Sequence, residues 1–290
     1  MTDNEPRMIE ALGHSPEPAV VMARSGPLSL PTTLIEVRAR TPARILNGRA
    51  GAAYRTATWL ELRSDHAAAR DAVRTEFGLT SDLGEAFVSK WGLFEVATRA
   101  HTKEDFLLRP DLGRSLNDAA RAELAQCCLA GADFQVAIAD GLSAAAVRTQ
   151  IPALLPLLAA EADRRGWRFG HPFFIRHGRV GTLNDIGEIL DPTVAVLLIG
   201  ERPGLATAES LSAYLAYRPR AGHDDAHRNM LSNIHGRGVP PDQAASRIAQ
   251  LAARMIELRA SGVAVKEEWK GETSSRIAPV PKIEPDRGIA

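Results

Sequence analysis

Two charged residues stand where a predicted buried strand ends. Residues 194–199 form a short apolar run between a proline and a glycine, a pattern typical of a strand buried on both faces. Glu201 and Arg202 follow this run and precede a Pro-Gly turn. In open parallel sheets ligands bind at the carboxyl ends of the strands, so the charged pair is a candidate ligand contact. An ordinary connection between a strand and a helix would show the same pattern, and both interpretations stay open.

A second stretch could hold a nucleophile. Residues 141–145 read GLSAA, which resembles the Gly-x-Ser-x-Gly turn of α/β hydrolases with alanine in place of the second glycine. Ser143 would be the nucleophile, and the residues that could complete a triad in hydrolase order are Asp185, Asp191 or Asp225, followed by His227 or His235. Alternatively, Ser143 caps the helix that we predict from Ala144 onward. We favour the cap, because so permissive a triad search succeeds in many sequences.

Other familiar motifs are incomplete or missing. Asp225-Ala226-His227 resembles the D-x-H-x-x-G motif that presents a histidine to cobalt in some corrinoid proteins, but its glycine is absent. We therefore interpret His227 as a surface or supporting histidine. No G-x-G-x-x-G follows a predicted strand, so no motif favours a nucleotide-binding or regulatory domain. The only cysteines, Cys127 and Cys128, are adjacent, which is typical of core or helix thiols in a reducing compartment.

The composition bounds the class of protein. The formal net charge is zero, so there is no global basic field to hold nucleic acid or an anionic membrane. No apolar run reaches the ~18–20 residues of a membrane span, and the N-terminus lacks a basic segment followed by an apolar one. Hydrophobic residues make up 45% of the 290-residue chain, as in globular proteins with a substantial core. We expect a cytoplasmic protein with no nucleic-acid or membrane partner.

Strands and helices that could position these residues alternate from residue 133 onward. Strands are predicted at 134–139 and 194–199, and an extended segment at 169–177. Helices are predicted at 144–150, 154–165, 184–190 and 243–260, and a further one from Thr207 or Ala208 with Glu209 in its first turn. Segment 211–217 stays open between helix and strand, and segment 229–235 between strand and ligand loop. The alternation predicts a mostly parallel sheet covered on both faces.

One edge of this sheet should collect the candidate residues, because loops that leave parallel strands converge at the carboxyl edge. The segments that we expect there are 140–143, 178–180, 201–205 and 228–233. A ligand site is therefore expected at this edge.

The predicted fold class is α/β, with a small helical N-terminal domain followed by a doubly wound, mostly parallel α/β (Rossmann-like) domain. The expected divisions are a flexible arm at 1–30, a helical domain at 31–100, the α/β domain at 101–265 and a disordered tail at 266–290. The tail contains few large apolar residues and several prolines and lysines, a composition that cannot build a packed core.

Several motifs of the chain resemble those of a known family. In the order seen in the light chain of ethanolamine ammonia-lyase, the sequence contains GRAG and a later DH, RPDLGR, ADGLSA, FFIRHGRV, IGEIL, LIGERPGL, SLSAYLAY and SNIH. The resemblance runs from about residue 34 to about residue 265. Several motifs are six or more residues long, so their joint order is hard to obtain by chance.

The resemblance implies a function. This chain would be the small subunit of an adenosylcobalamin-dependent enzyme that converts ethanolamine to acetaldehyde and ammonia by a radical mechanism. A heavy chain with a (β/α)8 barrel would hold the substrate, and this chain, through its α/β domain, would help to bind and cover the cobalamin. The hetero-oligomer would lie in the cytoplasm, free or inside a bacterial microcompartment.

The resemblance also implies which residues contact the cofactor. Val180, in GRV, would present backbone or an apolar surface, and Glu201, in GERPGL, would accept hydrogen bonds from amide or hydroxyl groups. Met230 occupies a third position, where relatives often carry cysteine; methionine keeps a soft apolar contact but cannot donate an S–H. Neighbouring candidates are Arg179, Arg202 and Gly204. No catalytic acid or base and no metal ligand is expected in this chain, because the cofactor carries the chemistry.

Overall fold

The computed structural model describes residues 32–39, 47–204 and 207–267. The chain divides into two compact units, residues 1–40 and 41–290. The described part of the first unit is one helix, α1 (Thr32–Ala39). The arm predicted at 1–30 and nearly all of the tail predicted at 266–290 lie outside the described residues.

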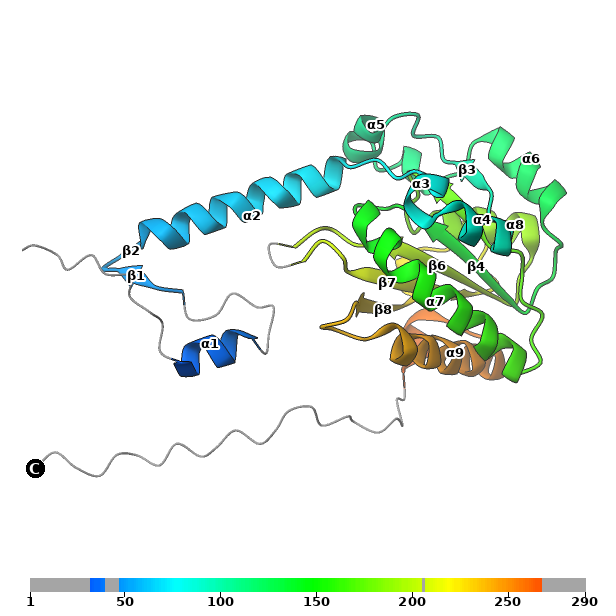
Figure 1. Ribbon diagram of the computed structural model, residues 1–290. Helices are drawn as coiled ribbons and strands as arrows, with labels where there is room; N and C mark the ends of the chain where they lie inside the picture. Colours follow the sequence, from blue (N-terminus) through cyan, green and yellow to red (C-terminus); the bar gives the residue numbers. More distant parts are fainter. Residues whose placement is uncertain (1–31, 40–46, 205–206, 268–290) are drawn as a thin grey trace, which may run out of the picture. The chain divides into compact units, whose positions relative to one another are not determined.

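The second unit is built around a six-stranded mixed sheet with the order β3-β5-β4-β6-β7-β8 (Figure 1). Its strands are β3 (Glu95–Ala97), β4 (Phe134–Ala139), β5 (Phe173–Arg176), β6 (Val194–Gly200), β7 (Leu211–Tyr217) and β8 (Asn229–Ile234). The four strands β3, β5, β4 and β6 are mutually parallel, whereas β7 is antiparallel to β6 and β8 antiparallel to β7. The predicted α/β fold class with a mostly parallel sheet is confirmed.

Helices bury both faces of the central strands. One face packs on α7 (Ala144–Arg164) and α9 (Pro241–Leu258), and the other on α6 (Asp118–Cys127) and α8 (Thr182–Leu190). Every residue of β4 and β6 is buried, as continuous apolar runs predict for strands covered on both sides. The two faces alternate along β4, with Ile138 in one core and Ala139 in the other.

Short elements complete the second unit. The remaining strands form a small antiparallel pair, β1 (Arg49–Ala50) and β2 (Ala53–Tyr54). The remaining helices are α2 (Thr56–Arg74), α3 (Leu79–Leu83), α4 (Glu85–Trp91) and α5 (Lys103–Leu108). Single 3₁₀ turns lie at Leu112–Arg114, Asp225–His227 and Gly262–Ala264. None of the helices in the described ranges is both long and apolar enough to cross a membrane.

The helix predicted from Thr207 or Ala208 is wrong. The described residues 207–210 form a loop, and the chain turns back from β6 into β7, where Gly200 pairs with Leu211. The backbone carbonyls of Ala208 and Glu209 accept hydrogen bonds from side chains of the α7 region instead of closing a helical turn. Because β7 buries side chains on both sheet faces, its pairing with β6 outweighs the local helix signal.

Two segments that the sequence left open are settled by the sheet. Residues 211–217 and 229–234 are strands, paired with each other across a local irregularity in register. The two predicted helices at 144–150 and 154–165 are one helix, α7, with Pro152 and Pro156 inside it. Pro152 lies on the exposed side of α7, where water can satisfy the carbonyl that the proline leaves unpaired.

The sheet begins earlier in the chain than the expected start of the α/β domain at residue 101. Strand β3 pairs with β5 through Glu95–Phe174 and Val96–Ile175. Its three residues are too few to be recognised by periodicity, and only the neighbouring strand makes them a strand. The division into domains at 31–100 and 101–265 stays a prediction.

Candidate functional site

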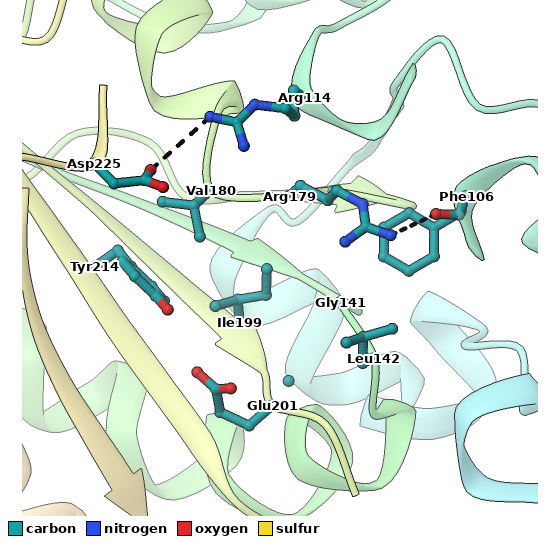
Figure 2. Close-up of a pocket in the computed structure, with 12 residues that line it drawn as sticks. Phe106, Arg114, Gly141, Leu142, Arg179, Val180, Ile199, Glu201, Tyr214 and Asp225 are labelled. Carbon is teal, nitrogen blue, oxygen red and sulfur yellow. Dashed lines mark hydrogen bonds and ion pairs between the residues drawn. The ribbon is translucent and has the colours of Figure 1, made fainter. Parts of the chain in front are cut away.

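A hollow of about 220 Å³ lies at the carboxyl edge of the sheet, where β4, β5 and β6 end (Figure 2). The ends of these strands contribute Gly141, Leu142, Gly178, Arg179, Val180, Ile199, Gly200 and Glu201. The other lining residues are Phe106, Arg114, Tyr214 and Asp225. Three of the four segments expected at this edge therefore meet in one hollow, and two of the three predicted cofactor contacts, Val180 and Glu201, face each other across it.

Beside the hollow, the backbone that follows β4 comes close to the backbone at the end of β6. Leu142 donates its N–H to the Gly200 carbonyl at 3.0 Å. A Cβ on Gly200 would lie 2.2 Å from the Ser143 carbonyl oxygen, and a Cβ on Gly141, whose φ is +56°, would lie 2.4 Å from the Gly200 oxygen. Only glycine fits both positions, so the glycines of ADGLSA and LIGERPGL bring the ends of β4 and β6 together.

Glu201 offers free acceptor oxygens at the rim. Its backbone N–H donates to the Ser210 carbonyl at 3.0 Å, which anchors the residue. Its carboxylate has neither a hydrogen-bond partner nor an ion-pair partner in the part of the chain that the structure describes. Burial raises the pKa of the Tyr214 phenol, and the negative charge of Glu201 raises it further. The carboxylate can therefore accept hydrogen bonds from a ligand, as its predicted role requires.

Arg179 places a cation on the opposite side of the hollow. Its Nη2 donates to the Phe106 carbonyl at 2.6 Å, and its guanidinium lies 4.3 Å from the centre of the Phe106 ring (Figure 2). Burial lowers the pKa of Arg179, and the positive charges of Arg114 and Arg202 lower it further. The neighbouring candidates Arg202 and Gly204 do not line the hollow.

Met230 lies apart from the other two predicted contacts. It is on β8, opposite Tyr214 of β7, and its side chain is 51% exposed. Because cross-strand partners share a sheet face, Met230 projects from the same face as Tyr214 but does not line the hollow. Segment 228–233, expected to be a loop at the carboxyl edge, is mostly strand β8. The role of Met230 as a cofactor contact stays a prediction.

A buried ion pair behind the hollow was not identified from the sequence. Asp140 is fully buried, and its Oδ1 accepts the N–H of Gly141 at 2.9 Å and that of Gly178 at 3.3 Å. Lys103 Nζ lies 3.6 Å from the other carboxylate oxygen and donates to the Gly141 carbonyl at 3.2 Å. Burial raises the pKa of Asp140, and Lys103 and His177 oppose this shift. The pair ties the loops after β4 and β5 together.

His177 extends this network. One ring nitrogen lies 3.1 Å from the Ala100 carbonyl and the other 3.3 Å from a Glu76 carboxylate oxygen. Ligand atoms of Glu76, Asp140 and His177 lie within 4.8 Å of one another, a spacing that a metal ion could use. Lys103 already supplies a positive charge to Asp140, so we interpret the group as an ion-pair network.

Ser143 caps α7. Its Oγ accepts the Ala146 N–H at 3.2 Å, and its hydroxyl donates to the Ala208 carbonyl. The two histidines proposed for a triad contact other groups, since His227 pairs with Asp224 and His235 lies 2.7 Å from the Asn233 amide oxygen. The predicted cap is confirmed, and no described contact joins Ser143 to an acid or a base.

The remaining motif residues are placed as follows. His227 is half exposed and stacks on His223 with ring centres 4.5 Å apart. Cys127 is exposed and Cys128 is buried. Burial raises the pKa of the Cys128 thiol to about 12, which keeps this thiol protonated and unreactive.

Comparison with known proteins agrees with the family that the motifs resemble. Residues 32–266 match the family described as ethanolamine ammonia-lyase light chain. The chain is 39% identical over 232 residues to the ethanolamine ammonia-lyase small subunit of Clostridium perfringens, covering 80% of this chain and 77% of that protein. Over the same coverage, it is 41% identical to the small subunit of Fusobacterium nucleatum and 39% identical to that of Listeria innocua.

The family match extends over most of the chain, and it includes the strand ends that form the hollow. By its sequence and by the α/β fold that carries the shared motifs, this chain belongs to the ethanolamine ammonia-lyase light chain family.

Proposed function

We propose that this chain is the small subunit of an ethanolamine ammonia-lyase, which converts ethanolamine to acetaldehyde and ammonia. The observation that carries the proposal is the family match over residues 32–266, supported by relatives of 39–41% identity that bear this name. The alternative, a serine hydrolase, has no support from these relatives, and Ser143 acts as a helix cap.

We propose that adenosylcobalamin lies against the hollow at the carboxyl edge. The residues present fit such a group, because they combine an acceptor in Glu201, a donor in Arg179 and apolar surface from Val180, Leu142 and Ile199. A corrinoid carries amide side chains around an apolar ring and needs these three kinds of contact. When bound, it would supply the radical by cleavage of its cobalt–carbon bond.

The size of the hollow indicates how much of the cofactor this chain would contact. Pockets that enclose a ligand typically measure about 300–1,000 Å³. The hollow here measures about 220 Å³, so it accommodates an edge of a corrinoid and leaves the rest to another surface. This chain would bind, orient and shield one side of the cofactor, with Met230 as a more distant contact on the same sheet face.

The other surface would belong to the large subunit. The name of the relatives, small subunit, implies such a partner. In this proposal a heavy chain with a (β/α)8 barrel holds ethanolamine, and the cofactor lies between the two chains. The hetero-oligomer would work in the cytoplasm, free or inside a bacterial microcompartment.

Co-expression with the heavy chain tests the proposal. We expect the two chains to co-purify and the complex to bind cyanocobalamin, detected by its visible absorption after gel filtration. A chain that purifies alone in the presence of the heavy chain, or a complex that binds no corrinoid, would contradict the proposal. A crystal structure of the complex with its corrinoid far from Glu201 would contradict the proposed position of the cofactor and leave the family assignment unchanged.

A further inference from the structure

Arg179 is the cation of the hollow that lacks an acidic partner. In the described part of the chain, its guanidinium makes one hydrogen bond, to the Phe106 carbonyl, and forms no ion pair. Its Nε is buried without a hydrogen-bond partner. A buried donor with no acceptor is costly to fold. Among the described residues, the guanidinium contacts only the carbonyl and the ring of Phe106, and neither contact neutralises its charge.

The neighbouring charges increase this imbalance. Arg114 and Arg202 are the charged groups that act most on Arg179, and both are positive. Asp225, the other carboxylate that lines the hollow, is paired with Arg228 and lies 3.9 Å from Arg114. Figure 2 shows Arg179 between the Phe106 ring and the open space of the hollow, with Glu201 on the far side.

The shape of the guanidinium indicates the kind of acceptor. Its planar array of N–H groups matches the oxygens of a carboxylate or a phosphate with two parallel hydrogen bonds. The amide side chains of a corrinoid are neutral, and the phosphodiester of its nucleotide loop is the one anionic group on its periphery. Glu201 repels an anion from its own side of the hollow and leaves that side to amide N–H donors.

We propose that Arg179 binds the phosphodiester of the cofactor's nucleotide loop, an inference that rests on the proposed function and orients the cofactor in the hollow. The phosphodiester lies on the Arg179 side, over Phe106, and the amide groups of the corrin ring lie on the Glu201 side. Val180, which also lines the hollow, supplies an apolar contact.

Three corrinoids that differ at the nucleotide loop test this orientation: cyanocobalamin, cobinamide phosphate and cobinamide, which lacks the phosphate. Each is titrated into the complex of this chain with its heavy chain. Arg179→Gln should lower the affinity of the complex for the first two corrinoids by about tenfold or more, as loss of a charge-assisted contact does. The affinity for cobinamide should change by no more than about twofold. The control is Arg109→Gln, an exposed arginine paired with Asp111 outside the hollow, which should change none of the three affinities.

A second measurement separates binding from a structural role. Arg179 is a half-buried cation without an acidic partner among the described residues, so its removal should leave the thermal midpoint of the corrinoid-free complex unchanged or higher. An equal loss of affinity for all three corrinoids, or no loss for any, would overturn the inference. A wild-type complex that binds no corrinoid would instead overturn the proposed function.

Arg179→Lys keeps the inference testable if Arg179→Gln does not assemble. Lysine retains the charge but loses the Nε donor and the planar array. A loss restricted to the two phosphate-bearing corrinoids supports the assignment. Failure of both variants to assemble with the heavy chain would overturn it, since Arg179 would then be structural.

Discussion

At the scale of single residues, Glu201 is the predicted cofactor contact with the clearest structural basis. Its carboxylate lines the hollow, and its acceptor oxygens are unused within the described residues. We expect Glu201→Ala to weaken corrinoid binding to the complex by about 1–3 kcal/mol, the usual effect of removing a charged acceptor. Equilibrium titration with cyanocobalamin measures the difference.

The control for Glu201 lies on the same connection between β6 and β7. Glu209 is exposed and outside the hollow, so Glu209→Ala should leave the affinity unchanged. Equal affinities of wild type and Glu201→Ala would remove Glu201 from the site.

Lys103 carries a prediction about pH. Lys103→Met removes the ammonium group that opposes the burial-driven rise in the pKa of Asp140, so this pKa rises further in the variant. A carboxyl whose pKa is higher in the folded than in the unfolded state binds more protons when folded, and the free energy of unfolding then falls as pH rises above the unfolded-state value of about 4. The variant should therefore lose more stability, relative to wild type, at high pH.

Urea unfolding of both full chains at about pH 5 and about pH 8 measures this loss. The lost contact of Lys103 with the Phe106 ring contributes at both pH values and cancels in the comparison. A stability difference between wild type and Lys103→Met that is the same at both pH values would show that Asp140 does not depend on Lys103 for its charge.

At the scale of elements, the start of α7 joins two parts of the sheet edge. Ser143 caps this helix and also holds the loop before β7 through the Ala208 carbonyl. Ser143→Ala should lower the free energy of unfolding by about 1–2 kcal/mol, measured by chemical denaturation. The same variant tests the hydrolase alternative: ester turnover by the wild-type chain that Ser143→Ala abolishes would restore it.

The contact between the ends of β4 and β6 is a second element-scale prediction. Gly200→Ala would force a Cβ against the Ser143 carbonyl and push the two strand ends apart. We expect a loss of about 1–3 kcal/mol in the free energy of unfolding, as for overpacked sites, together with weaker corrinoid binding. Gly236→Ala is the matched control, because a Cβ there meets nothing within 4 Å. Similar stabilities of the two variants would show that the strand ends can separate freely.

At the scale of the whole molecule, the proposed function gives this chain one side of a site that two chains share. The hollow is too small to enclose a corrinoid, and no triad is assembled around Ser143 among the described residues. We therefore expect the isolated chain to form no acetaldehyde from ethanolamine and adenosylcobalamin, and activity to appear on mixing with the heavy chain. A coupled assay with alcohol dehydrogenase follows the product, and turnover by this chain alone would refute the proposal.

Some of the fold and the site follows from local patterns. The apolar runs of β4 and β6, the apolar stripe of α9 and the cap at Ser143 each depend on residues close in sequence. Parallel strands share their carboxyl edge, so the approach of Val180 to Glu201 also follows from the alternation of strands and helices.

Only the tertiary structure decided the rest. β7 became a strand, and residues 207–210 a loop, because burial against β6 and β8 outweighs local helix propensity. The contact of Arg179 with Phe106 spans 73 residues and that of Lys103 with Gly141 spans 38, distances that no periodicity reaches. Sequence determined that the ends of β4, β5 and β6 would meet, because the alternation of strands and helices predicts parallel strands. Long-range packing placed residues 229–234 in the antiparallel strand β8, and it decided which charges line the hollow and which of them lack a partner among the described residues.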